Sequence, residues 1–135
     1  MASGVTVSDA CKTKIAELPT SLSTLNYIIF KISSDNKSIV IDESGKTSSY
    51  EDFPDKLPTA ECRWALYNFR HGNEGSGYKY SKVFIAWSPD DAKIKAKMLY
   101  SSSKGTMRDA ITGIAVDISA TSSSDISYDT ISKKF

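Results

Sequence analysis

Runs of apolar, β-branched and aromatic residues predict five β-strands along the chain. Residues 25–32 (LNYIIFKI) and 38–42 (SIVID) are separated by the polar turn SSDN, so we expect a first hairpin there. Residues 62–69 (CRWALYNF) and 79–87 (KYSKVFIAW) flank HGNEGSG, whose glycines favour a turn, which predicts a second hairpin. Residues 113–118 (GIAVDI) predict the fifth strand.

Apolar residues at helical spacing predict two short helices in the first half of the chain. Residues 7–19 have this spacing, with Ser8 as the N-cap and Pro19 as the stop. Residues 47–58 repeat Tyr50, Phe53 and Leu57 along one face of a second helix. The start of this helix is open, because Pro54 has no backbone donor and fits only within the first turn.

Two more helices are predicted in the second half. Ser88 is suited to cap a long basic helix, Pro89 fits its first position, and two aspartates follow near the positive end of the helix dipole. Gly105 is expected to bend or interrupt this helix. The polar residues 124–135 (SDISYDTISKKF) predict a closing helix with its isoleucines turned inward.

The predicted element order is α, ββ, α, ββ, α, β, α, and it favours an α/β fold of the mixed α+β type. The long helical crossover allows the fourth and fifth strands to lie parallel, while the hairpins are antiparallel. A five-stranded mixed sheet sandwiched between helices follows. At 135 residues, with no linker and no repeat, the chain is expected to form one domain over residues 1–135.

Composition and charge exclude few functions. The formal net charge of +1 disfavours general attraction to nucleic acid or an anionic membrane. Residues 35–61 are mainly acidic and residues 79–108 mainly basic, so we expect one basic side. No apolar run approaches the roughly 20 residues of a membrane span, and residues 1–10 lack the layout of a secretory signal. The expected location is therefore the cytoplasm, with Cys11 and Cys62 as free thiols.

Catalytic and metal-binding patterns are not found. His71 is the single histidine, so a catalytic triad or Cys/His pair would have to be built in the glycine-rich turn. Neither cysteine has a second ligand at zinc spacing, and a strand rather than a helix follows the glycines, unlike a phosphate-binding loop. We expect no metal, no cofactor and no enzymatic activity. An unrecognised active site around His71 and a small nucleic-acid-binding module stay as minor alternatives.

The predicted basic helix carries a charged stripe. At ~100° per residue, one stripe about 80° wide contains Lys93, Lys97, Ser101, Lys104 and Arg108. Lys95 lies ~160° from Lys97, so these two lysines bracket a face that Ile94 and Met98 fill. From the residues alone, the stripe is either a solvated surface or a binding surface.

The segment WSPDDAKIKAKMLYSSSKGTMRDAI resembles the signature of the actin-depolymerising factor/cofilin family, with its Trp-Ser-Pro-Asp start, Lys-x-Lys-Met core and Tyr-x-Ser-Ser-Lys continuation. The similarity extends to Ser3-Gly4-Val5, to YEDF followed by LP, to the Cys62-Arg63 strand entry and to Gly113-Ile114. It covers nearly the whole chain. The resemblance implies the actin-depolymerising-factor homology fold, which is gelsolin-like.

The resemblance also implies actin as the partner, as a monomer, preferably ADP-bound, and in filaments, which the protein would sever and depolymerise. It assigns contacts with both forms to Ser3, Gly4, Val5, Ile94, Lys95, Lys97 and Met98. Filament-specific contacts are assigned to Lys79, Lys82, Lys133 and Lys134. Lys82, however, lies five positions before Trp87, where the family has a basic residue six positions before, so the direction of its side chain is open.

Regulation is implied by the same resemblance. Phosphorylation of Ser3 would add negative charge that repels an acidic partner. Phosphoinositide headgroups would bind Lys93, Lys95, Lys97, Lys104 and Arg108 in competition with actin. The expected protein is a monomer at the actin cytoskeleton, with entry into the nucleus left open. The alternative within the fold is a filament side-binder of the coactosin kind that does not depolymerise.

Overall fold

The computed structural model describes residues 5–18, 25–47, 49–73, 75 and 77–135. They form one mixed sheet with the strand order β1-β3-β2-β4-β5-β6. Both hairpins are antiparallel and β5 is parallel to β6, as predicted. The strands are β1 (Thr6–Val7), β2 (Tyr27–Ile32), β3 (Ser38–Gly45), β4 (Arg63–Asn73), β5 (Gly77–Trp87) and β6 (Ile114–Ala120).

The mixed α/β fold predicted from the sequence is confirmed, with six strands rather than five among the described residues. The added strand, β1, is two residues long and pairs with β3 in parallel, Thr6 beside Ser38. Two residues are too few for a periodic signal, which is why the sequence did not predict it. The helices are α1 (Asp9–Glu17), α2 (Ile94–Asp109) and α3 (Tyr128–Ser132), with 3₁₀ helices η1 (Tyr50–Asp52), η2 (Pro54–Lys56) and η3 (Ser123–Ile126).

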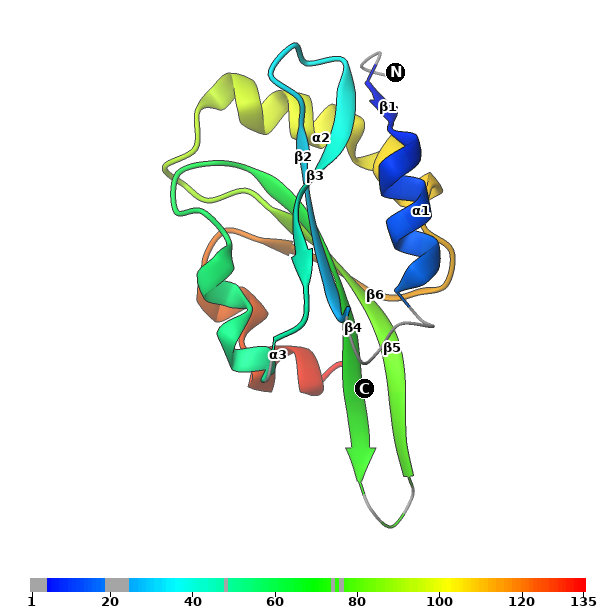
Figure 1. Ribbon diagram of the computed structural model, residues 1–135. Helices are drawn as coiled ribbons and strands as arrows, with labels where there is room; N and C mark the ends of the chain where they lie inside the picture. Colours follow the sequence, from blue (N-terminus) through cyan, green and yellow to red (C-terminus); the bar gives the residue numbers. More distant parts are fainter. Residues whose placement is uncertain (1–4, 19–24, 48, 74, 76) are drawn as a thin grey trace.

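Helices cover both faces of the sheet. Figure 1 shows α1 and α2 on one side and α3 on the other, with the β4–β5 hairpin projecting beyond them. Alternate residues of each strand serve the two sides, since Val83 and Ile85 belong to one buried cluster and Phe84 to the other. Each side of the sheet therefore has its own hydrophobic core.

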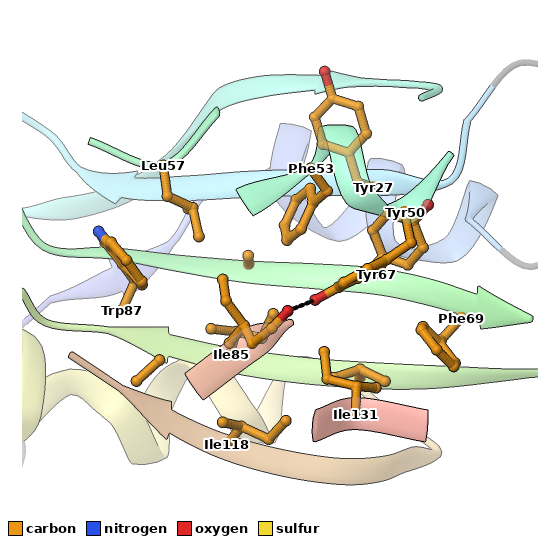
Figure 2. Packing of buried hydrophobic residues seen from close by; sticks show 14 of the residues in the cluster. Tyr27, Tyr50, Phe53, Leu57, Tyr67, Phe69, Ile85, Trp87, Ile118 and Ile131 are labelled. Atoms are coloured by element: carbon orange, nitrogen blue, oxygen red, sulfur yellow. Dashed lines mark hydrogen bonds between the residues drawn. The ribbon is translucent and has the colours of Figure 1, made fainter. Parts of the chain in front are cut away.

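The core beneath η1 and α3 is rich in aromatic residues (Figure 2). The Tyr50 ring meets Tyr67 edge-on, with centroids 4.7 Å apart, and Phe69 likewise at 5.2 Å. Its hydroxyl donates a hydrogen bond of 2.6 Å to the carbonyl of Ile126 in η3. Burial raises the pKa of Tyr50 strongly, because the ionised phenolate would lose its hydration. Tyr50 thus connects two segments that are far apart in the sequence.

One short helix begins as predicted, and two other predicted helices differ in detail from the observed ones. Ser8 caps α1 as predicted, accepting a hydrogen bond from the amide of Cys11. The predicted helix at residues 47–58 is instead η1 and η2, because its amides bond three residues back, as Leu57 does to Pro54. The closing helix is divided into η3 and α3 by Ser127, which is extended and caps α3.

The long basic helix begins later than predicted. Ser88 does not cap it, because the Ser88 amide donates to the carbonyl of Ala120 and so prolongs the pairing of β5 with β6. A turn over residues 89–92 follows, and α2 begins at Ile94 with Lys93 as its N-cap residue. Gly105 does not interrupt α2, which is continuous to Asp109.

The second hairpin is longer than predicted, because strand pairing continues through most of the glycine-rich segment. His71 pairs with Lys79 and Asn73 with Gly77, so His71 lies within β4 and not in the turn. Gly77 has φ +86°, a conformation that favours glycine and lets the chain reverse at that point. The hairpin therefore extends strand residues well past the helical layers (Figure 1).

Candidate functional site

The outer face of α2 presents two large apolar side chains to solvent. Ile94 is 75% exposed and Met98 is 67% exposed, the highest values among the large hydrophobic residues described. The opposite face of the helix is anchored by Ser103 and Met107, both fully buried. Ile94 and Met98 are one turn apart, so they form a contiguous apolar patch on a helix whose inner side is fixed.

Lysines flank this patch, as the helical spacing predicted. Lys95 is exposed on one side, and Lys97 is partly buried on the other. The Lys97 ammonium donates to the carbonyl of Asp90 at 3.0 Å, which places it beside the turn that precedes α2. We define the helix patch as Ile94, Lys95, Lys97 and Met98.

The rest of the basic stripe is directed toward the sheet. Lys104 and Arg108 both approach the carboxylate of Asp117 on β6, at 3.4 and 3.0 Å. One carboxylate thus partly neutralises two cations of the stripe. Asp117 was not predicted from the sequence, although an acidic residue in the strand after a basic helix was the available signal.

Tyr100 and Trp64 fix the position of α2 on the sheet. The Tyr100 hydroxyl accepts a hydrogen bond of 2.9 Å from the amide of Ile32 at the end of β2. Its ring lies 4.5 Å from that of Trp64, and burial raises the pKa of Tyr100. No role for Tyr100 was predicted from the sequence, because a single tyrosine on a helix does not reveal its hydrogen-bond partner.

The amino-terminal residues assigned by the resemblance are only partly visible. Ser3 and Gly4 lie outside the described residues. Val5 is 4% exposed and packs in the core on the side of α1 and α2. Its side chain is therefore not available to a partner, and the residue instead fixes the start of β1, which lies against α2.

The basic residues assigned to filament contacts do not all lie together. Lys79 and Lys82 are three positions apart in the continuous β4–β5 pairing, so their side chains are on opposite faces of the sheet. The Lys82 ammonium donates to the carbonyl of Thr112, at the α2–β6 connection. Lys79 pairs with His71, whose ring stacks on Phe135 at 4.0 Å, which brings Lys79 to the side of α3.

Lys133 and Lys134 are exposed just after α3, on this same side. We define the hairpin patch as Lys79, Lys133 and Lys134. Lys82 lies outside it, in agreement with the one-residue offset seen in the sequence.

The surroundings of His71 are those of a packed strand residue. Its Nε2 lies 2.8 Å from the hydroxyl of Ser81, and its ring is covered by Phe135. In the part of the chain that the structure describes, no three His, Cys, Asp or Glu side chains gather as a metal site. Cys11 and Cys62 are both free and buried. No helix among the described residues has the length and apolar character of a membrane span.

A family model and individual relatives from other organisms all indicate the same protein family. A family described as Cofilin/tropomyosin-type actin-binding protein matches residues 4–135. Cofilin of Mycosarcoma maydis is 42% identical over 134 residues, which cover 99% of this chain and 96% of the relative. Actin-depolymerizing factor 2 of Petunia hybrida is 41% identical over 129 residues, covering 95% and 90%.

Solved structures agree with this. The crystal structure of Streptomyces griseoflavus cofilin matches with a TM-score of 0.90 at 38% identity, covering 97% of this chain and 96% of that one. The crystal structure of coactosin from Entamoeba histolytica matches with a TM-score of 0.85 at 25% identity, covering 98% and 94%. With the family profile over nearly its whole length and relatives at about 40% identity, the chain belongs to the cofilin/actin-depolymerising factor family.

Proposed function

We propose that this protein binds actin through the helix patch. The observation that carries the proposal is the exposure of Ile94 and Met98 on a firmly anchored helix, between two lysines, in a chain of this family. In protein interfaces, buried apolar anchors near the centre supply most of the affinity. Charges at the rim speed association with an oppositely charged partner. The helix patch has this arrangement, and it suits a cleft with apolar walls and an acidic rim.

The amino-terminal residues belong to the same proposed contact. Val5 is buried on the side of α1 and α2, and β1, which follows it, lies against α2. Ser3 and Gly4 contact actin beside the patch in this proposal, whereas Val5 acts by anchoring them. Phosphorylation of Ser3 would place about two negative charges there and weaken binding to an acidic surface.

The hairpin patch provides the second contact, made only in filaments. Two contacts with neighbouring subunits allow one protein to change their relative orientation, which is the basis of severing and subunit loss. We propose both activities, with preference for ADP-bound actin. Lys82 takes no part, because it lies on the other face of β5. Binding energy alone drives these changes, so no reaction is proposed.

The basic side chains on and just before α2 also suit phosphoinositide headgroups in competition with actin. Lys93 and Lys95 are exposed and accessible to a membrane surface. Lys97, Lys104 and Arg108 contribute more weakly in this proposal, since Lys104 and Arg108 share Asp117 and Lys97 is partly buried. In this proposal the protein acts as a monomer in the cytoplasm at the actin cytoskeleton, and entry into the nucleus is left open.

A dilution assay with pyrene-labelled actin filaments tests the proposal. Diluted filaments are expected to lose fluorescence faster when the protein is added, and a Met98→Ala variant should reduce this acceleration. A coactosin-like side-binder would sediment with filaments and leave the rate unchanged. That result would show that the protein binds the sides of filaments without depolymerising them. If the protein did not sediment with filaments at all, binding to actin filaments would itself be refuted.

A further inference from the structure

A cavity of about 370 Å³ lies between α2 and the sheet, and it shares Lys97 with the helix patch. Ser88, which follows β5, and Thr121, which follows β6, both line it. It therefore opens at the carboxyl ends of two adjacent parallel strands, with α2 as the crossover between them. In open α/β sheets, ligands bind at this edge, and the volume is within the range of about 300–1,000 Å³ found for small-molecule sites.

The floor of the cavity is apolar and contains two aromatic rings whose planes are tilted by 41°. Trp64 and Tyr100 line it with ring centroids 4.5 Å apart, and Ala86 and Ala120 leave space beside them. Tyr100 cannot easily turn away, because its hydroxyl is held by the amide of Ile32. A rigid aromatic floor next to small side chains favours a flat ring system as the ligand's apolar part.

The walls of the cavity are cationic. Arg63, Lys97 and Lys104 all line it, and the lining includes no carboxylate. Burial disfavours the charge of Arg63, but Asp42 more than offsets this and the pKa of Arg63 is raised, so its guanidinium stays charged.

Arg63 is paired with Asp42 and Glu61, but the other two cations of the walls, Lys97 and Lys104, are incompletely neutralised. In the described part of the chain, no carboxylate lies within ion-pair distance of Lys97, whose recorded partner is the carbonyl of Asp90. Lys104 shares the single charge of Asp117 with Arg108. Positive charge thus remains around a partly closed space, where it attracts an anion more strongly than it would on an open surface.

Hydroxyl groups complete the lining. Ser88, Ser101, Ser119 and Thr121 add hydrogen-bond donors beside the three cations. Such a mixture of cationic and hydroxyl donors is suited to the several oxygens of a phosphate group. We propose that this cavity binds a small soluble anion that combines a flat ring with a phosphate group, of the nucleoside monophosphate class.

Titration of the purified protein with adenosine 5′-monophosphate, followed by tryptophan fluorescence, tests the proposal without actin. Both tryptophans of the chain line the cavity, so occupancy is expected to change their emission. We expect saturable binding with a Kd of about 1 mM or tighter, and binding of adenosine or inorganic phosphate at least about ten-fold weaker. Absence of saturation, or equal binding of inorganic phosphate, would overturn the proposal.

Matched variants locate the site. Ser101 is exposed at the cavity mouth, so Ser101→Leu should close it and weaken binding at least about ten-fold, while Ser102→Leu on the same helix should not. Lys104→Gln should weaken binding, and Lys95→Gln, outside the cavity, should leave it unchanged. If both variants of a pair lost mononucleotide binding equally, the loss would reflect general surface charge or damage to α2. That result would refute the site. Melting temperatures measured in parallel identify any variant that fails to fold.

Vesicles containing phosphatidylinositol bisphosphate separate a lipid source from a soluble one. A headgroup held in a bilayer contacts exposed lysines and does not enter the cavity, so Ser101→Leu should leave vesicle sedimentation unchanged. Binding of vesicles but not of the mononucleotide, with vesicle binding lost in Ser101→Leu, would assign the cavity to lipid headgroups and overturn the proposal.

Discussion

Truncation of the two exposed apolar residues of α2 is expected to weaken actin binding without destabilising the fold. Full burial of an isoleucine or methionine side chain is worth about 1.5–3 kcal/mol. Because Ile94 is 75% and Met98 is 67% exposed, most of that free energy is still available to a partner, about 1–2 kcal/mol for each residue. Alanine keeps the Cβ atom, so a loss of about 1 kcal/mol per substitution is expected.

The corresponding assay is a titration of fluorescently labelled monomeric actin. Each single variant, Ile94→Ala and Met98→Ala, should raise the Kd about five-fold, and the double variant by about 10- to 30-fold. Thermal unfolding should be unchanged or slightly improved, because alanine favours helix and neither side chain is buried. Ser102→Ala on the next turn is the control. A lowered melting temperature, or a Kd like that of Ser102→Ala, would refute the reasoning.

Three further predictions concern stability and the hairpin patch. Tyr50→Phe should lower the free energy of unfolding by about 1–3 kcal/mol in urea denaturation, because a buried carbonyl of η3 loses its donor. Burial and Glu43 raise the pKa of Tyr27 to about 12, so its neutral form stabilises the fold fully below about pH 10, the unfolded pKa, and loses this effect as the pH rises through 12. Urea unfolding from pH 9 upward should therefore show a steeper loss in wild type than in Tyr27→Phe, and equal slopes would contradict this. Lys79→Ala should reduce sedimentation with filaments, while Lys82→Ala should not. A loss of sedimentation in Lys82→Ala but not in Lys79→Ala would refute the hairpin patch as a filament contact.

Much of the sheet could be predicted because its strands alternate between two cores. The runs that became β2, β4 and β5 are rich in β-branched and aromatic residues, and the helical crossover correctly indicated that β5 and β6 are parallel. The same alternation explains why Lys79 and Lys82 lie apart, since an odd separation in a regular strand places side chains on opposite faces. The predicted bracketing of Ile94 and Met98 by Lys95 and Lys97 also follows from periodicity alone.

The misplaced elements depend on contacts that are distant in sequence. Ser88, Pro89 and two aspartates form a strong local signal for a helix start, yet the Ser88 amide pairs with Ala120 and holds the chain extended. The glycines after His71 resemble a turn, but Gly72 and Gly77 are part of the strand pairing. The local preference of a sequence for a helix start or a turn is weak. At both places, hydrogen bonds to residues distant in the sequence outweighed it.

The candidate site shows the same limit. Periodicity identified which residues share a face of α2, but not that Asp117 would draw Lys104 and Arg108 toward β6. Nor could it place the cavity beneath the helix, because that space depends on Tyr100 and Trp64 packing across elements. Local helix geometry is enough to predict which residues share a face of α2. Their contact partners on other elements can be found only once the fold is known.

Co-sedimentation with actin filaments tests the central claim most directly. Wild-type protein is compared with Lys95→Ala/Lys97→Ala and with Lys12→Ala/Lys46→Ala, a control that removes two exposed lysines outside α2. Wild type and control should pellet with filaments to the same extent, and the α2 double variant, folded by its melting temperature, should stay largely in the supernatant. Equal pelleting of all three proteins would contradict the assignment of the helix patch as the actin-binding surface.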